Sequence, residues 1–420
     1  MTDVFGVEWL WVCVSKVSPV GFVSGLRRRG ELRRDMSRAS KSWAGAFVAA
    51  AVVGSLTATV MPSQAAPRAA SGAGASAVAS VPVVVASGLH NPRAVRVQPD
   101  GALLVTEAGS DPAVPCTVPG SQCLSFSGSI YRIKGSVRGR VVTGLPSMQI
   151  VRADGSSVIS GAIEAEAAAG GAYRVVSGVT GTPTTRTALG AGSGPLGTLS
   201  IAHGRVLGDL AVHEVEHDPD SAVGNNEVFS NPWNFARDGR DFLVTDAGAN
   251  DLVRVHPDGT TSTELAFPNN VVPAAAASGD AALAPAGQAE AVPTGIVRGW
   301  DGAFYIADMS GIRTGLSRIW RYVPGGQPTV FASGLTGLID LAVAPGGDLI
   351  ALSYTGGATS SGLLPGSLIR IGKKTGAATV IDTGGSLNTP TGVAVTSKGD
   401  IYVTSNTQGS SGELLKFPAS

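Results

Sequence analysis

Sustained helical periodicity is missing from this sequence after residue 80, and charged residues make up only 15% of the chain. Both features argue against an all-helical fold, because amphipathic helices need apolar residues every three to four positions. Residues 66–420 also lack a nucleophile elbow, a phosphate loop and a dinucleotide fingerprint. The sequence therefore shows none of the short motifs that mark the enzymes built on them.

Tight turns and short apolar runs are abundant instead. The 420 residues include 57 glycines and 25 prolines. One phrase recurs, in which a Pro or Gly is followed by an apolar run, an Asp-Gly-like turn and a second apolar run. Its copies begin at Pro92, Pro232, Pro293, Gly337 and Pro390. Asp-Gly between alternating apolar runs predicts a β-hairpin. Such hairpins, repeated at intervals of tens of residues, predict a β-propeller built from four-stranded blades.

A sixth blade is predicted within residues 146–206, where Gly161–Ala167 and Gly171–Val176 fit its first two strands. The alternative for this Ala/Gly/Thr-rich stretch is a disordered insertion, with five repeats plus a loop. The apolar phrase Val84–Leu89 precedes the first blade, and the last blade, ending at Phe417, lacks its outermost strand. We therefore expect an all-β, six-bladed β-propeller over residues 81–420, closed by the N-terminal strand completing the C-terminal blade.

The N-terminal region looks like an export signal. Arg38 and Lys41 precede a small-residue apolar run, which ends in Ser63-Gln64-Ala65. This order is typical of a signal peptide over residues 36–65, with cleavage after Ala65 and a flexible linker over 66–80. Residues 1–35 are interpreted as a mis-assigned upstream start. A membrane anchor is the competing interpretation of the apolar run.

Few cysteines remain once residues 1–65 are removed. Cys116 and Cys123 close a short loop, which in an exported protein favours a disulfide over a metal site. Residues 66–420 carry 23 Lys and Arg against 27 Asp and Glu. This slightly negative balance indicates no nucleic-acid partner. We expect a secreted protein with no stable membrane span after cleavage. We also expect a monomer, because a closed ring leaves no free edge.

From Val83 to Phe417 the chain resembles the ScyD/ScyE family of exported propellers, which is related to NHL and gluconolactonase-type propellers. The matching motifs are Pro115-Cys116…Cys123 with Gly128-Ser129-Ile130, Leu196–Leu199, Asn231-Pro232-Trp233, Val292–Gly295, Ile339-Asp340 and Pro390–Val393. The resemblance implies the propeller fold and export. It implies no defined reaction, and nothing in the chain indicates a link to scytonemin biosynthesis.

Ligands of propellers usually bind where the innermost strands begin and the second strands end. The repeats place Glu107, Asp246, Asp308 and Asn406 at second-strand ends, and Trp233 and Asp340 near first-strand starts. The four acids suggest a ring of oxygen ligands for Ca²⁺ or Mg²⁺, which gluconolactonase-type relatives use to polarise a lactone carbonyl. The alternative is that each acid caps the turn that follows it, although Asp340 opens a strand rather than a turn.

A His-Glu-x-x-His pattern is present at His213, Glu214 and His217 and matches a zinc-protease motif. Asp218-Pro219 stops any helix directly after it, because the residue before proline is disfavoured in the α conformation. Glu227 is the one nearby third ligand. We interpret the motif as a decoy within a solvated helical loop on the rim.

The sequence therefore predicts a propeller that binds a small molecule, a glycan or an extracellular protein on its central-channel face, without a certain cofactor or catalytic residue. A lactonase-like hydrolase or lyase dependent on Ca²⁺ or Mg²⁺ is the alternative. A quinone-dependent sugar dehydrogenase is a third interpretation, resting on the resemblance of residues 88–107 to the opening blade of such enzymes.

Overall fold

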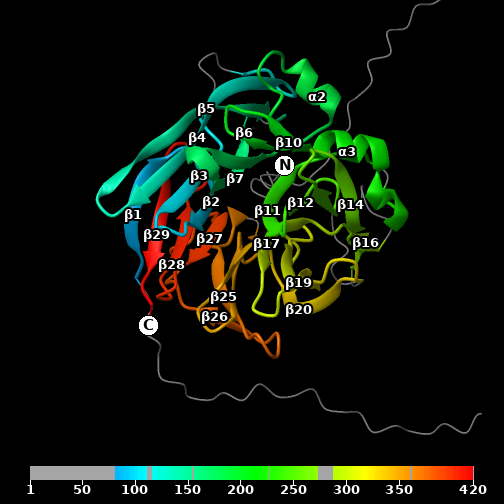
Figure 1. The fold of residues 1–420 in the computed structure, drawn as a ribbon. Helices are drawn as coiled ribbons and strands as arrows, with labels where there is room; N and C mark the ends of the chain where they lie inside the picture. Colours follow the sequence, from blue (N-terminus) through cyan, green and yellow to red (C-terminus); the bar gives the residue numbers. More distant parts are fainter. Residues whose placement is uncertain are drawn as a thin grey trace, which may run out of the picture. The chain divides into compact units, whose positions relative to one another are not determined.

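The computed structural model describes residues 81–110, 116–153, 156–225, 227–272, 287–359 and 362–419. These residues form six antiparallel β-sheets arranged as the blades of a ring (Figure 1). We number the blades along the chain and call the strand nearest the ring axis the inner strand. The start face is the face of the ring on which the inner strands begin, and the end face is the opposite one.

The first three blades follow one another along the chain. Blade 1 consists of β2 (Pro92–Val97), β3 (Leu103–Glu107), β4 (Gln122–Lys134), β5 (Val137–Val151) and the short β6 (Ser157–Ser160). Blade 2 consists of β7 (Ala162–Ala167), β8 (Tyr173–Ser177), β9 (Thr198–Ile201) and β10 (Val206–Asp209). Blade 3 consists of β11 (Pro232–Asp238), β12 (Asp241–Asp246), β13 (Asp251–Val255) and β14 (Thr261–Ala266).

The last three blades complete the ring. Blade 4 consists of β17 (Pro293–Arg298), β18 (Phe304–Asp308), β19 (Ser317–Tyr322) and β20 (Thr329–Leu335). Blade 5 consists of β21 (Leu338–Val343), β22 (Leu349–Ser353), β25 (Ser367–Ile371) and β26 (Ala378–Ile381). Blade 6 consists of β27 (Gly392–Val395), β28 (Ile401–Ser405), β29 (Gly412–Phe417) and β1 (Val83–Leu89). The six-bladed prediction is confirmed.

The ring closes through its two ends. β1 pairs antiparallel with β29, in a register that sets Val83 opposite Lys416 and Ser87 opposite Glu413. Figure 1 shows the blue β1 beside the red β29. Leu89 of β1 is fully buried in an apolar cluster that includes Val95 and Leu414. The predicted closure is thus confirmed, and β1 protects an edge that β29 would otherwise expose.

Residues 162–209 form an ordered blade, so the alternative of a disordered insertion is wrong. β7 and β8 occupy the two segments predicted for the first strands, and β9 and β10 complete the sheet. The boundary differs from the prediction, because Met148–Val151 pairs with β6 and so belongs to blade 1. Alanine and glycine make this blade look irregular in sequence, yet its side chains Ala162, Ala165 and Val175 are buried against blade 1.

The turns follow the Asp-Gly signal. In blade 1 the Asp100 side chain accepts a hydrogen bond from the Ala102 N–H at 3.1 Å, and Gly101 has a φ of 76°. In blade 4 Asp301 accepts from Ala303 N–H in the same way, and Gly302 has a φ of 79°. Positive φ favours glycine because it has no Cβ. Local turn chemistry therefore sets the hairpins.

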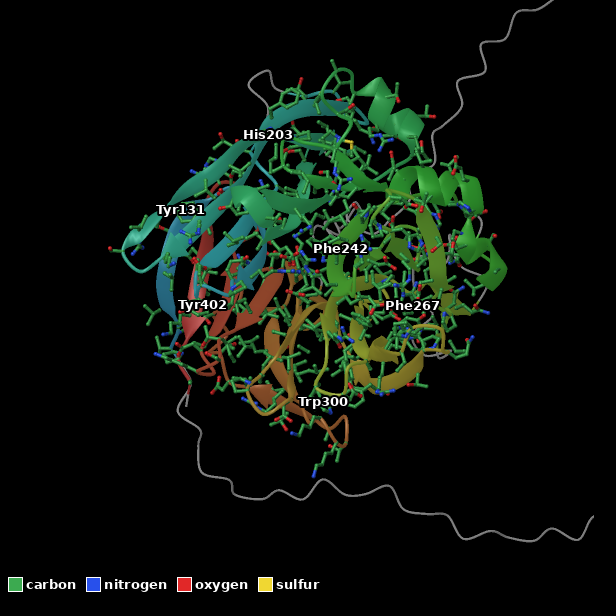
Figure 2. All side chains as sticks on the ribbon, in the orientation of Figure 1. Tyr131, His203, Phe242, Phe267, Trp300 and Tyr402 are labelled. Atoms are coloured by element: carbon green, nitrogen blue, oxygen red, sulfur yellow. A yellow bond between two sulfur atoms is a disulfide. The ribbon has the colours of Figure 1, made fainter. Side chains whose placement is uncertain are left out.

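The core lies between neighbouring blades. Separate apolar clusters fill the contacts of blades 3 and 4, of blades 4 and 5, and of blades 6 and 1. Figure 2 shows side chains filling the spaces between the sheets, with Phe267 beside blade 4 and Phe242 near the middle of the ring. The Phe267 ring lies 5.7 Å from that of Trp320, which is one of these interblade contacts. Each blade is stabilised by its neighbours, as in other repeat architectures.

Two α-helices and several smaller elements lie outside the blades. α2 (Pro183–Ala188) begins with a capping box between Thr182 and Thr185, and α3 (Leu210–His217) begins at Asp209, whose side chain accepts from the Val212 N–H. The remaining elements are the 3₁₀ helices η1 (Ala169–Gly171) and η2 (Pro219–Val223) and the two short ribbons β15 (Asn270–Val271) with β16 (Gln288–Ala289) and β23 (Ala358–Thr359) with β24 (Gly362–Leu363). These helices lie in the segments around blades 2 and 3.

The predicted disulfide is present between Cys116 and Cys123, with the two Cα atoms 5.9 Å apart. Disulfides of this kind persist outside the reducing cytoplasm. Among the described residues, no helix is long and apolar enough to cross a bilayer. The predicted upstream segment, signal peptide and linker, residues 1–80, lie outside the described residues and stay predictions.

Candidate functional site

Three of the predicted site acids occupy the same place in their blades. Strand pairing sets Glu107 opposite Pro92, Asp246 opposite Pro232 and Asp308 opposite Pro293. Each acid therefore ends a second strand where an inner strand begins, on the start face. The repeat alignment predicted this placement.

Glu107 is fully buried, and its carboxylate is held within blade 1. It accepts hydrogen bonds from the His90 N–H at 2.7 Å and from the Ser129 hydroxyl, and it forms an ion pair of 2.7 Å with Arg140. The hydrogen bond to Glu107 raises the pKa of Arg140 above its usual value. The Glu107 side chain thus connects the turn between β1 and β2 to β4 and β5.

Asp246 and Asp308 cap the turns that follow them. The Asp246 carboxylate accepts from the Gly248 and Ala249 N–H groups at 3.0 and 3.1 Å, and from Asn231 N–H at 2.6 Å. Burial raises the pKa of Asp246, although these hydrogen bonds lower it in part.

Asp308 is likewise fully buried. It accepts from the Val292 and Ser310 N–H groups at 3.0 Å each. It also pairs with the Arg318 guanidinium at 2.8 Å, and the Trp320 indole donates to it at 3.1 Å.

These contacts decide how well the acids fit a divalent metal. Ca²⁺ needs six to eight oxygens that converge on one point. In the part of the chain that the structure describes, the hydrogen bonds of Glu107, Asp246 and Asp308 stay within their own blade and its connecting turns. The three acids do not fit a shared metal. The turn-capping alternative describes the contacts of Asp246 and Asp308, whereas Glu107 binds the His90 N–H, Ser129 and Arg140 instead.

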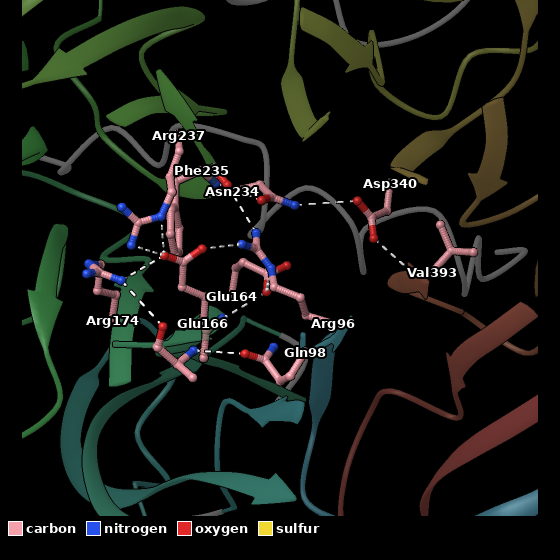
Figure 3. A network of polar contacts seen from close by, with 12 residues as sticks. Arg96, Gln98, Glu164, Glu166, Arg174, Asn234, Phe235, Arg237, Asp340 and Val393 are labelled. Carbon is pink, nitrogen blue, oxygen red and sulfur yellow. Dashed lines mark hydrogen bonds and ion pairs between the residues drawn. The ribbon is translucent and has the colours of Figure 1, made fainter. Parts of the chain in front are cut away.

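Asp340 differs from the other three acids because it lies on an inner strand. Its carboxylate accepts from the Leu341 N–H at 2.9 Å. It also accepts from the Val393 N–H at 2.8 Å and from the Asn234 amide at 3.4 Å (Figure 3). It therefore joins blades 3, 5 and 6 near the axis. Burial raises the pKa of Asp340 to about 8, and the charge of Glu164 adds to this shift.

The last two predicted site residues have structural contacts. Trp233 is 4% exposed and belongs to the central apolar cluster with Ile339 and Val393. Asn406, with a φ of 52°, accepts from the Asn388 amide at 2.8 Å and donates to Glu413 at 3.0 Å. Neither lies in the charged network described next.

The sequence analysis missed a set of charged residues on the inner strands, which we call the Arg96–Glu166 network. It consists of Arg96, Glu164, Glu166, Arg174 and Arg237 (Figure 3). Arg96 on β2 pairs with Glu164 and Glu166 on β7, at 3.0 Å each, and donates to the Phe235 carbonyl of β11 at 3.1 Å. Arg174 and Arg237 also pair with Glu166, at 2.7 Å each. The network thus links three blades.

The network lies toward the end face and is richer in cations than in anions. Strand pairing sets Arg174 opposite Glu166 and Arg237 opposite Phe242, at the ends of the inner strands. Three guanidinium groups face two carboxylates, and burial raises the pKa of Glu164 above its usual value. The Arg237 side chain is 46% exposed.

Two phenylalanine rings support the guanidinium groups. The Arg96 guanidinium lies 4.9 Å from the Phe235 ring centre, and those of Arg174 and Arg237 lie 5.3 and 4.9 Å from that of Phe242. Phe235 and Phe242 themselves meet edge to face at 5.8 Å. Stacked arginines lose less freedom on binding an anion, because their planes are already fixed.

A sequence signal exists for one member of the network and for two neighbouring residues. Glu164 shares the third position of its inner strand with Asn234 and Asp340, when the strands are aligned by their pairing. The repeat alignment compared strand starts and second-strand ends, which leaves out the middle of the inner strands.

The His-Glu-x-x-His segment forms a short helix, as predicted, but it is not a solvated loop. Both His213 and Glu214 are 1% exposed. The His213 ring nitrogens lie 3.0 and 2.9 Å from the hydroxyls of Thr261 and Thr263 on β14. Burial lowers the pKa of His213 to about 4. With both nitrogens engaged, these contacts support the interpretation that the motif is not a zinc site.

Five four-stranded blades and one five-stranded blade, closed through the N-terminal strand, make the chain a six-bladed β-propeller. No family model and no curated protein matches it.

Solved structures that are similar to this chain include a glucose dehydrogenase, at 15% identity and a TM-score of 0.43 over 81% of this chain and 100% of that one. A virginiamycin B lyase from Staphylococcus aureus is 12% identical with a TM-score of 0.43, over 80% of this chain and 98% of that one. The calcium-binding protein regucalcin from Agrobacterium tumefaciens is 11% identical with a TM-score of 0.42, over 81% of this chain and 98% of that one. We argue function from the site alone, because likeness at this level does not transfer an activity.

Proposed function

We propose that this chain is a secreted binding propeller that takes a small anionic molecule, such as a sugar acid or an acidic glycan end, at the end face of its inner strands. The observation that carries the proposal is the convergence of Arg96, Arg174 and Arg237 on Glu166, with Arg237 half exposed. Guanidinium groups recognise carboxylates through paired N–H donors. Arg237 uses Nε and Nη2 on Glu166, and its exposed edge faces solvent.

Binding without catalysis fits the remaining predicted site residues best. A divalent-metal hydrolase would need Glu107, Asp246, Asp308 and Asp340 to share one ion. Three of these acids are committed to main-chain and arginine contacts in separate blades. The hydrolase alternative therefore has no specific observation in its favour.

Membership of the ScyD/ScyE family stays part of the proposal. Two of its quoted motifs have structural roles here: Asn231-Pro232-Trp233 starts β11, and the Thr391 hydroxyl donates to the Arg93 carbonyl at 2.7 Å, joining blade 6 to blade 1. Residues with these roles would be common to the members of the family, because they build the ring. Export and a monomeric state belong to the same proposal and rest on the signal-like residues 36–65 and on the closed ring.

The proposal is tested by following the melting temperature of the full chain in the presence of gluconate, glucuronate and galacturonate, with glucose and sorbitol as neutral counterparts. We expect the anions to raise the melting temperature and the neutral compounds to leave it unchanged, because only the anions can pair with the guanidinium groups.

Two variants locate the site. Arg237→Ala should abolish the shift, whereas Arg240→Ala, an exposed arginine of the same hairpin, should keep it. Equal shifts with neutral compounds, or an unchanged response of Arg237→Ala, would reject the proposal.

A further inference from the structure

A second acidic cluster lies away from the Arg96–Glu166 network, where α3 and η2 connect blade 2 to blade 3. α3 ends at His217, the next residue Asp218 has a left-handed backbone with a φ of 42°, and Pro219 starts η2. This sharp turn brings Glu214, Asp218 and Asp220 together. One carboxylate oxygen of each lies within 4.8 Å of the others.

The cluster is joined to the sheet of blade 3. The Asp220 carboxylate accepts from the Asn250 amide at 2.7 Å and from the Asn225 amide at 3.1 Å. Asn250 precedes Asp251, the first residue of β13. All three of Asp220, Asn250 and Asp251 are fully buried.

Asp251 provides an independent sign that a ligand is involved. Both of its carboxylate oxygens are buried and accept no hydrogen bond, and the same is true of the Asn250 amide oxygen. Among the described residues, no lysine, arginine or histidine forms an ion pair with Asp251. Burial raises the pKa of Asp251 well above its usual value, and the charges of Asp246, Glu214 and Asp220 raise it further.

A buried carboxylate without a partner is strongly unfavourable, so native proteins pair it, protonate it or use it to bind a metal. The oxygens here are those of carboxylates and an amide. Hard oxygen donors of this kind suit Ca²⁺, whereas zinc sites draw on histidine and cysteine. The nearby His213 ring already contacts Thr261 and Thr263 through both nitrogens.

We propose that Glu214, Asp218, Asp220 and Asp251 bind one calcium ion, which fastens the α3–η2 connection to blade 3. The Asn250 amide oxygen and water complete the coordination shell. The ion is structural: its four carboxylates come from the interblade connection and from β13, away from the Arg96–Glu166 network. Its binding is therefore independent of the proposed anion site.

The test uses the full chain, stripped of metal with EDTA and passed through a chelating resin. Calcium is then added during isothermal titration calorimetry, and the melting temperature is followed in parallel. We expect one calcium ion per chain and a melting temperature that rises with the logarithm of the calcium concentration. The absence of both binding heat and a shift in melting temperature at 10 mM calcium would overturn the proposal. It would mean that the carboxylates share protons instead of binding calcium.

Matched variants locate the ion. Glu214→Gln and Asp251→Asn should each weaken calcium binding at least tenfold, because each removes a charged ligand. Glu216→Gln on the same helix and Asp258→Asn in the same blade make the same charge changes at exposed positions, and both should bind calcium as the unmodified chain does. Unchanged binding by Asp251→Asn, or equal losses in both control variants, would overturn the assignment.

The stability of Asp251→Asn provides a second measurement that does not depend on affinity. In EDTA this variant should be at least as stable as the unmodified chain, because a neutral amide replaces a buried and repelled carboxylate. In saturating calcium the order should reverse. If Asp251→Asn is the less stable chain in both conditions by the same amount, Asp251 has a packing role only and the proposal fails.

Discussion

At the residue scale, the ion pairs on the inner strands combine side chains from three blades. Glu164 is 4% exposed at its side chain, and its ion-pair partner is Arg96. Removing one partner of a buried pair leaves the other charge uncompensated, which costs more than the pair itself contributes.

We therefore expect Arg96→Met to lower the free energy of unfolding by about 3 kcal/mol. This is the lower end for buried pairs, since Arg96 keeps 26% of its side-chain surface exposed. Adding Glu164→Gln should restore part of the loss, because no unpaired carboxylate remains. A double-mutant cycle from urea unfolding measures the coupling, and strictly additive losses would contradict the role of the pair.

The Asp340 carboxyl should make stability depend on pH. Its folded pKa of about 8 lies above the unfolded value near 3.8, so the folded chain holds a proton that the unfolded chain has lost between these values. Stability contributed by this group is complete below pH 4 and is lost as pH rises toward 8. One proton corresponds to a slope of up to about 1.4 kcal/mol per pH unit.

Asp340→Asn cannot ionise, so we expect its free energy of unfolding to fall less steeply than that of the unmodified chain between pH 5 and 8. At pH 5 the variant should be about 1–3 kcal/mol less stable, since an amide cannot accept from all three of the Leu341, Val393 and Asn234 donors. Urea titrations at several pH values measure both effects. Parallel slopes for the two chains would rule out Asp340 as the titrating group.

At the element scale, neighbouring inner strands approach closely, and glycine permits this approach. A Cβ added at Gly392 of β27 would lie 2.6 Å from the Ala94 Cα and from the Arg93 carbonyl oxygen of β2. The same holds at Gly295 of β17, where a Cβ would lie 2.6 Å from the Asp340 Cα. Glycine here serves packing between blades.

Gly392→Ala should lower the free energy of unfolding by about 1–3 kcal/mol, because main-chain atoms of two strands must move apart. Gly139→Ala provides the control, since its Cβ would meet no atom within 4 Å. We expect that variant to change stability by less than about 0.5 kcal/mol. Equal effects of both variants in thermal or urea unfolding would contradict the close approach of β27 and β2.

At the scale of the whole molecule, closure by β1 makes the ring depend on residues near its N-terminal end. A chain beginning at His90 lacks β1, exposes the edge of β29 and loses the burial of Leu89 and Ala86. We expect a loss of about 3 kcal/mol or more, together with association through the free edge.

A chain beginning at Val81 is the matched control, and we expect it to unfold as the full chain does. Calorimetry and size-exclusion chromatography measure the two outcomes. If the chain beginning at His90 remains monomeric and melts at the same temperature as the control, β1 does not close the ring in solution.

The blades could be predicted because their signals are local. Each hairpin is encoded within about twenty residues, as in Asp100-Gly101 and Asp301-Gly302, and the unmatched phrase Val84–Leu89 revealed the closure. The Cys116–Cys123 disulfide was predictable for the same reason, because seven positions separate the two cysteines. Glu107, Asp246 and Asp308 were placed correctly on the start face, although their contacts are those of turn and strand connections.

The charged groups near the axis could not be predicted in this way. Arg96 contacts Glu164 across 68 positions and the Phe235 carbonyl across 139, and the acidic cluster joins Asp220 to Asn250 across 30. A sequence identifies such residues as polar but not as neighbours. The sequence by itself thus determined the six blades and their closure, because turns and strand periodicity act over short distances. Only the tertiary structure decided which charges meet, because that depends on how the blades are rotated about a common axis.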